Sequence, residues 1–238
     1  MGVTVLGCDG SWPGPGGAGS GYLVTYRSTT VWLDAGPGTF ATLQQHVDPA
    51  AVDAVVVSHD HSDHWSDLQC LDTYTRFGPG RSPVPVFGPR SGSSWTGLRR
   101  SGAFDWHPLS DGDLVEIGEL ACRFSRTDHG PETLAVRMDG GGRSLGYSAD
   151  SGPDWSFLEL GTGIDLALCE ATYTSGDEGT AGHMSGRQAG AQARHAGAGR
   201  LVLTHRWPSV SAAAVAAEAA EAFGGEVEQA AIGKEYLL

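Results

Sequence analysis

Short apolar segments bounded by turn-forming residues recur along this 238-residue chain, and they constrain its fold more than any other feature. Several are continuous β-branched runs, such as Val55-Val56-Val57, which are typical of a strand covered on both faces. The 40% hydrophobic share is large enough to build that cover. The predicted strands are Val3–Leu6, Tyr22–Tyr26, Val31–Leu33, Ala54–Ser58, Val84–Phe87, Ala121–Ser125, Leu134–Arg137, Ser144–Ser148, Leu166–Cys169 and Leu201–Thr204.

Helices are fewer and alternate with the strands. Ser185 and Gln188 have the spacing of a capping box, and Gly197 is the stop signal for the helix that follows them. The predicted helices are Ala189–Ala196, an Ala/Glu-rich Ser211–Phe223, Phe40–His46 and one after His64. Because strands followed by helices occur twice, the prediction is an α/β (α+β) fold: a four-layer αββα sandwich formed by a single domain, 1–238.

Composition and charge exclude several classes of protein. A net charge of −13, with Lys234 as the one lysine, disfavours a protein that coats nucleic acid. No apolar run approaches the ~20 residues that span a bilayer, and the first residues do not read as a signal peptide. The four cysteines are far apart and form no C-x-x-C pair, which indicates reduced thiols. We therefore expect a cytoplasmic protein without a membrane partner.

The strongest chemical signal is the segment Ser58-His59-Asp60-His61-Ser62-Asp63-His64. It begins where the strand containing Val55 leaves the sheet, and a rigid strand end is a usual support for a site. An extended start places His59 and His61 on one side, and a following turn can bring Asp63 and His64 to a second point. The segment can therefore supply two adjacent metal ions.

Three further groups of metal-ligand type also follow predicted strands: His129, Asp150 and His205. One such residue is ordinarily a polar loop residue, but several at strand ends are more easily explained by one shared site. Imidazole and carboxylate ligands without thiolate suit Zn²⁺, with Mn²⁺ or Fe as competitors.

With these motifs, nearly the whole chain resembles the metallo-β-lactamase superfamily. The resemblance implies that Asp150 bridges two zinc ions and that Asp34 is a buried carboxylate orienting a ligand histidine. The ligands it implies are His59, His61 and His129 for one ion, and Asp63, His64 and His205 for the other. In addition, Asp63 would orient a nucleophilic hydroxide that the two ions activate.

Two more motifs indicate a subgroup. Cys169-Glu170-Ala171-Thr172 and Gly182-His183-Met184-Ser185 resemble motifs of the tRNA 3′-processing endoribonucleases and their phosphodiesterase relatives. The resemblance implies that His183 protonates the leaving oxygen and that Glu170 supports it. Phosphodiester cleavage needs such an acid opposite the activated nucleophile.

The substrate class is less constrained. The endoribonucleases usually insert a long basic arm between the positions of His129 and Asp150, whereas here a short stretch with Gly140-Gly141-Gly142 predicts only a hairpin. The chain is most similar to short members without the arm, which include cyclic-nucleotide phosphodiesterases. A small anionic phosphodiester is therefore the first hypothesis. Ribonuclease Z-like tRNA processing, thioester or lactone hydrolysis and a non-enzymatic metal-binding role are the alternatives, and a homodimer is possible.

Overall fold

The structure is a computed structural model that describes residues 1–79, 83–91 and 95–238. Within these ranges two seven-stranded mixed sheets face each other, in the orders β14-β1-β2-β3-β4-β5-β6 and β13-β12-β11-β10-β9-β8-β7. The first sheet comprises β1 (Gly2–Gly7), β2 (Gly21–Tyr26), β3 (Thr29–Ala35), β4 (Ala54–Val56), β5 (Val84–Pro89), β6 (Phe104–Leu109) and β14 (Glu235–Leu237). The second comprises β7 (Leu114–Ile117), β8 (Leu120–Arg126), β9 (Leu134–Gly140), β10 (Arg143–Tyr147), β11 (Leu166–Glu170), β12 (Arg200–Thr204) and β13 (Val227–Gln229).

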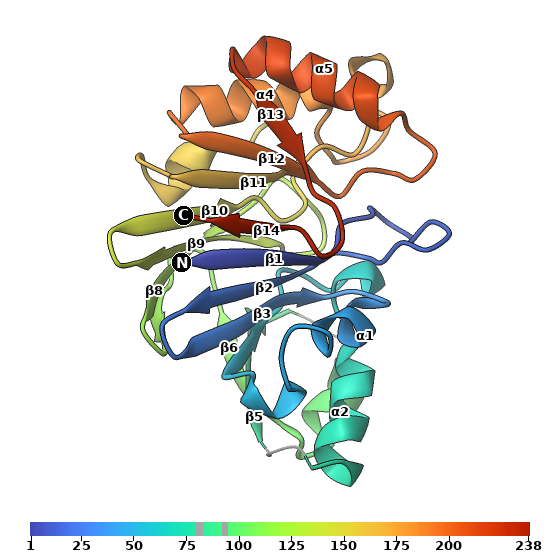
Figure 1. Cartoon of the computed structure of the whole chain (residues 1–238), viewed down its shortest axis with the longest axis vertical. Helices are drawn as coiled ribbons and strands as arrows, with labels where there is room; N and C mark the ends of the chain where they lie inside the picture. The colour runs from blue at the N-terminus through green and yellow to red at the C-terminus, as the bar shows by residue number, and fades with distance from the viewer. Residues whose placement is uncertain (80–82, 92–94) are drawn as a thin grey trace.

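Helices cover the outer face of each sheet, as the predicted four-layer sandwich requires (Figure 1). The α-helices are α1 (Thr39–Leu43), α2 (Leu68–Phe77), α3 (Thr96–Arg99), α4 (Gly186–His195) and α5 (Ala212–Phe223). The 3₁₀ turns are η1 (Pro49–Ala51), η2 (Ser62–His64), η3 (Phe157–Leu160) and η4 (Ser175–Asp177). No helix among the described residues combines the length and hydropathy needed to cross a membrane.

The main core lies between the two sheets. Every second residue of their strands contributes to it, because successive side chains of a strand point to opposite faces. Val5 and Val24 from the first sheet and Phe124, Val136 and Leu168 from the second are all buried there. A second apolar layer joins α1, α2 and α3 to the first sheet, and a third joins α4 and α5 to the second. Strands buried on both faces explain the continuous apolar runs in the sequence.

The two C-terminal helices begin close to their predicted positions, α4 at Gly186 in place of Ala189 and α5 at Ala212 in place of Ser211. Ser185 and Gln188 form the capping box at the start of α4, and Ser211 caps α5. Gly186 and Gly190 lie against backbone carbonyls of α5, where an added Cβ would overlap them. These two glycines, four positions apart on α4, therefore allow the two helices to approach closely.

The structure differs from the prediction at several element boundaries and in two edge strands. The helix expected over 40–46 is α1, Thr39–Leu43, because the chain already turns at His46, whose N–H bonds the Leu43 carbonyl. β4 ends at Val56 and not at Ser58, because the N–H of Ser58 donates to the Asp34 carboxylate instead of to a neighbouring strand. The partly exposed edge strands β6 and β7 were not predicted.

Candidate active site

The predicted ligands all follow the carboxyl ends of strands, and the fold brings these ends together. They are His59, His61, Asp63 and His64 after β4, His129 after β8, Asp150 after β10 and His205 after β12. Their side chains lie within groups whose ligand atoms are no more than 4.8 Å apart. Of the three groups of this kind among the described residues, two correspond to the predicted pair of metal sites.

The segment after β4 has the two-part conformation that its spacing predicts. His61 is extended, with φ −77° and ψ 139°, and η2 then turns the chain so that the N–H of His64 bonds the His61 carbonyl. The carbonyl of Asp63 accepts a hydrogen bond from Ser20 N at 3.2 Å. Gly36 lies so close to this carbonyl that a Cβ there would overlap it. The turn is therefore fixed from the β2 and β3 side.

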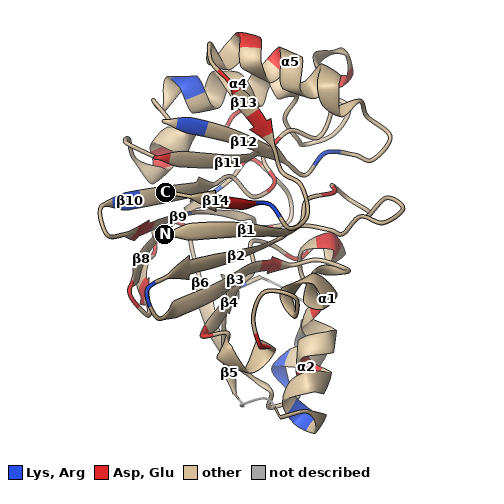
Figure 2. Cartoon of the chain, viewed as in Figure 1, with Lys and Arg blue, Asp and Glu red and all other residues tan. Residues whose placement is uncertain are grey.

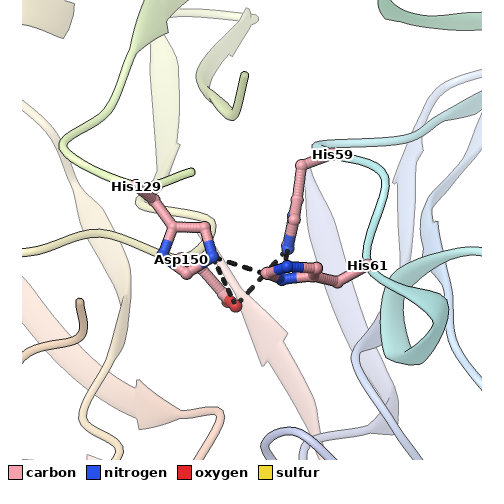
Figure 3. A group of neighbouring side chains, drawn as sticks. All are labelled: His59, His61, His129 and Asp150. Carbon is pink, nitrogen blue, oxygen red and sulfur yellow. Dashed lines mark hydrogen bonds and ion pairs between the residues drawn. The ribbon is translucent and has the colours of Figure 1, made fainter. Parts of the chain in front are cut away.

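The first group joins three imidazoles to one carboxylate oxygen (Figure 3). His61 Nδ1 lies 3.0 Å from His59 Nε2 and 3.2 Å from His129 Nε2. Asp150 Oδ2 lies 3.5 Å from His59 Nε2 and 3.8 Å from His129 Nε2. Three ring nitrogens and an oxygen that converge on one point form a ligand set for a divalent cation.

The second group meets the other oxygen of Asp150. Asp150 Oδ1 lies 3.3 Å from His64 Nε2 and 3.4 Å from His205 Nε2. Asp63 Oδ2 lies 3.5 Å from His64 Nε2 and 3.2 Å from His205 Nε2. Each oxygen of Asp150 thus faces a different group, which is the geometry that a carboxylate bridging two ions requires.

Two buried atoms show that these residues fit a metal. His64 Nε2 and Asp150 Oδ1 have no hydrogen-bond partner, although buried polar atoms are almost always paired. Burial alone would lower the pKa of His64, but the carboxylates of Asp150, Asp63 and Asp34 together raise it well above its usual value. The position therefore attracts positive charge, and a cation between the two groups would satisfy both orphaned atoms.

Asp34 contacts His64, the contact that its predicted role requires. Its Oδ2 lies 2.8 Å from His64 Nδ1 and also accepts the hydroxyls of Ser58 and Tyr147 at 2.8 Å, while Oδ1 accepts Ser58 N–H at 2.7 Å. With Nδ1 held in this way, His64 Nε2 is directed toward Asp150. The carboxylate is fully buried, so these four contacts replace its hydration.

Backbone strain is concentrated at the same strand ends. The backbone φ angles of Asp34, Ala149 and His205 are 55°, 50° and 52°. Residues other than glycine rarely adopt this left-handed conformation. All three are buried: Asp34 contacts the ligand His64, Ala149 directly precedes Asp150, and His205 is itself a member of the second group. Strain of this kind persists where packing imposes it, and it gathers at functional sites.

His183 and Glu170 form the predicted pair beside the two groups. His183 Nδ1 lies 3.0 Å from Glu170 Oε1 and 3.9 Å from Asp150 Oδ2. Burial would lower the pKa of His183, but the Glu170 carboxylate outweighs it and raises that pKa to about 9. Glu170 is itself fixed, because it accepts hydrogen bonds from Ser151 N and Thr172 Oγ1 at 2.6 and 2.8 Å. The Glu170 carboxylate therefore favours the protonated form of His183 next to the ligand groups.

Sequence reasoning missed the groups that support the ligands. Besides Ser58 and Tyr147, the hydroxyl of Thr172 lies 3.1 Å from His205 Nδ1, and the Gly182 carbonyl lies 2.8 Å from His129 Nδ1. Thr172 could have been found, because it stands two residues after Glu170 at the end of β11 and so on the same side of the extended chain. Tyr147 meets Asp34 across the sandwich, and no spacing along the chain predicts that contact.

Comparison with known proteins agrees with the fold and the site. A family model described as a beta-lactamase superfamily domain matches residues 29–206, well over half of the chain. The chain belongs to the metallo-β-lactamase superfamily. It is 36% identical over 242 residues to an uncharacterized protein of Mycobacterium tuberculosis, an alignment that covers 94% of this chain and 88% of the relative.

Other members of the superfamily are similar in sequence or structure. The probable metallo-hydrolase YhfI of Bacillus subtilis is 32% identical over 214 residues, which are 86% of each chain. Its crystal structure superposes with a TM-score of 0.93, at 29% identity and 99% coverage of both chains. The short form of human tRNase Z has a TM-score of 0.78 at 20% identity, covering 100% of this chain and 99% of that one, a likeness of fold alone.

Proposed function

We propose that this protein is a dinuclear zinc phosphodiesterase acting on a small phosphodiester such as a cyclic nucleotide. The broader class, a metallo-hydrolase, is supported by the two ligand groups on Asp150 and by the similarity to YhfI. The finer assignment depends on one observation: the His183–Glu170 pair lies 3.9 Å from the shared carboxylate. A protein that only binds metal has no need of a protonated imidazole at that place.

The residues divide the chemistry between them. Two bound divalent ions would supply an activated water and neutralise phosphoryl oxygens. Asp63 places Oδ2 between His64 and His205, where it can accept a hydrogen bond from the attacking water and so orient it. On the opposite side of the phosphorus, His183 donates its proton to the leaving alkoxide, and Glu170 keeps the imidazole charged and aligned until it does.

The shape and charge of the chain support a small substrate. β9 and β10 form a tight antiparallel hairpin with Gly141 and Gly142 at positive φ, so the stretch between His129 and Asp150 holds no arm. In Figure 2 the basic residues are scattered among acidic ones along the described chain, which suits a small anion more than a polyanion.

A tRNA 3′-processing endoribonuclease is the second candidate. The similarity of fold to human tRNase Z and the resemblance of the motifs around Glu170 and His183 to those of the endoribonucleases favour it, whereas the missing arm and the net charge of −13 count against it. Thioester or lactone hydrolysis is a weaker alternative, because these reactions do not need the His183 proton.

The test is hydrolysis of 3′,5′-cyclic AMP by protein loaded with Zn²⁺ or Mn²⁺, with His183→Ala as the matched variant. We expect turnover that falls by about 10²–10⁴-fold in the variant while both ions stay bound, the range typical of a lost general acid. Absence of turnover by wild-type protein shown to hold two ions would refute the cyclic-nucleotide assignment, and a tRNA precursor would then be assayed. Loss of metal from His183→Ala would refute the acid role.

A further inference from the structure

A glycine-rich loop after β1 lies along the segment that contains His205. Asp9 forms a parallel bridge with Arg206, and Gly10 N donates to the Arg206 carbonyl at 3.0 Å. Gly10 packs so tightly on the backbone of His205 that a Cβ there would overlap it. Ser11 N lies 3.4 Å from His205 Nε2, the ring atom of the second ligand group. The loop therefore borders the metal site directly.

This loop ends a series of three aromatic rings that leads from the acid to the solvent. The buried Tyr173 donates its hydroxyl to the His183 carbonyl at 2.7 Å. Trp207 meets Tyr173 edge-on, with ring centroids 5.7 Å apart, and Trp12 stacks on Trp207 at 6.0 Å with an angle of 30°. Trp12 is 48% exposed. In Figure 1 the loop after β1 and the loop between β12 and α5 project beyond the same edge of the sheets.

The structure fixes the position of Trp12 more firmly than a solvent-exposed loop residue requires. Trp207 Nε1 donates to Ser11 Oγ at 3.0 Å, and Gly14 N donates to Asp9 Oδ2 at 2.8 Å. Hydrogen bonds on both sides of Trp12 thus hold it against Trp207. A large, flat and half-exposed ring in a fixed position is a stacking platform whose conformational entropy is already lost.

Arg206, the basic residue next to His205, does not compete with Trp12 for contact with a ligand. The Arg206 guanidinium donates to the carbonyls of Trp207, at 2.8 Å, and Val210. It therefore covers its own loop. The rim beside His205 therefore offers a ring face and no free arginine of this segment, which suits an uncharged aromatic group joined to an anion.

We propose that Trp12 stacks on the nucleobase of the substrate while the phosphodiester lies at the ligand groups of Asp150. The proposal rests on the proposed function and names its substrate class: a nucleoside cyclic phosphate, recognised through its base. Consecutive Cα atoms are about 3.8 Å apart, so Trp12 starts one residue from the atom of Ser11 that contacts His205. That separation suits the few bonds that join a base to its phosphate. Stacking on a ring face also predicts tolerance of both purines and pyrimidines.

The test compares a substrate that carries a base with one that lacks it. kcat/KM is measured for 3′,5′-cyclic AMP and for ribose 3′,5′-cyclic phosphate, in wild type, Trp12→Ala, Trp12→Phe and the control Phe77→Ala. Phe77 is an exposed aromatic residue at the end of α2, outside the site. We expect Trp12→Ala to lower kcat/KM for cyclic AMP by about 5–150-fold, mainly through KM, as loss of one base–aromatic stack predicts. Trp12→Phe and Phe77→Ala should stay near wild type, and the base-free substrate should not respond.

A binding measurement separates this proposal from the proposed function. In metal-loaded protein, calorimetry should show 5′-AMP binding more tightly than ribose 5-phosphate, and Trp12→Ala should abolish that difference. Equal affinity of the two ligands for wild type would overturn the stacking role, whether or not cyclic AMP is hydrolysed. An equal loss of activity on both cyclic substrates would overturn it as well, because it would mean that Trp12 only maintains the loop. Hydrolysis itself decides the proposed function separately.

Discussion

Replacing Glu170 by Gln removes the charge that sustains the proposed acid while keeping the size of the side chain. Burial lowers the pKa of His183, and Glu170, at 3.0 Å, more than compensates and raises it from 6.5 to about 9. In Glu170→Gln burial acts without that opposing charge, and only the smaller effect of the Asp150 carboxylate remains, so we expect the pKa of His183 to fall toward its ordinary value of 6.5.

The effect on activity follows from the protonated fraction of His183. A general acid works only in its protonated form, so a raised pKa keeps the wild type active until the pH approaches 9. At pH 8 about 90% of His183 is protonated with a pKa near 9, and about 3% with a pKa near 6.5. Glu170→Gln should therefore be about 30-fold slower than wild type at pH 8 and less than about twofold slower at pH 6.

The assay is kcat/KM for cyclic AMP between pH 5.5 and 10. Glu178→Gln is the matched control, because Glu178 pairs with Arg187 and Ser185 outside the site. It should leave the profile unchanged. Circular dichroism must show that Glu170→Gln is folded, since the amide leaves one of the buried donors Ser151 N or Thr172 Oγ1 poorly paired, at about 1–3 kcal/mol. An alkaline limb at the same pH in Glu170→Gln and wild type would refute the argument.

Two further substitutions test the support of the ligands. Asp34→Asn should weaken the ion held by His64 by about 10–100-fold in a chelator competition and leave the first ion in place; equal weakening of both ions would contradict its role. Gly36→Ala should lower Tm through overpacking worth about 1–3 kcal/mol, because its Cβ would overlap the Asp63 carbonyl, whereas Gly97→Ala meets no atom within 4 Å and should not. Equal Tm values for these two variants would show that Gly36 has no such contact.

The sequence predicted the fold and the convergence of the ligands for the same reason. Continuous apolar runs identify strands that are buried on both faces, and the polar residues after them lie at sheet ends. The segment from His59 to His64 is local, so its extended start and turn could be inferred from spacing alone. The capping box of α4 is local as well and was predicted correctly.

What the sequence did not reveal depends on contacts between distant segments. β6 and β7 are partly exposed edge strands that have few neighbours to impose a continuous apolar pattern. Tyr147 reaches Asp34 from the other sheet, and Trp12 meets Trp207 from the far end of the chain. Such pairs arise only when both sheets are assembled, and two of them direct or border the site.

The most direct test of the central claim is a crystal structure of zinc-loaded protein with anomalous diffraction at the zinc edge. The arrangement predicts two peaks about 3.5–4 Å apart. One should lie among His59, His61 and His129, the other among Asp63, His64 and His205, with one oxygen of Asp150 on each. A single peak, or two peaks that Asp150 does not bridge, would contradict the account.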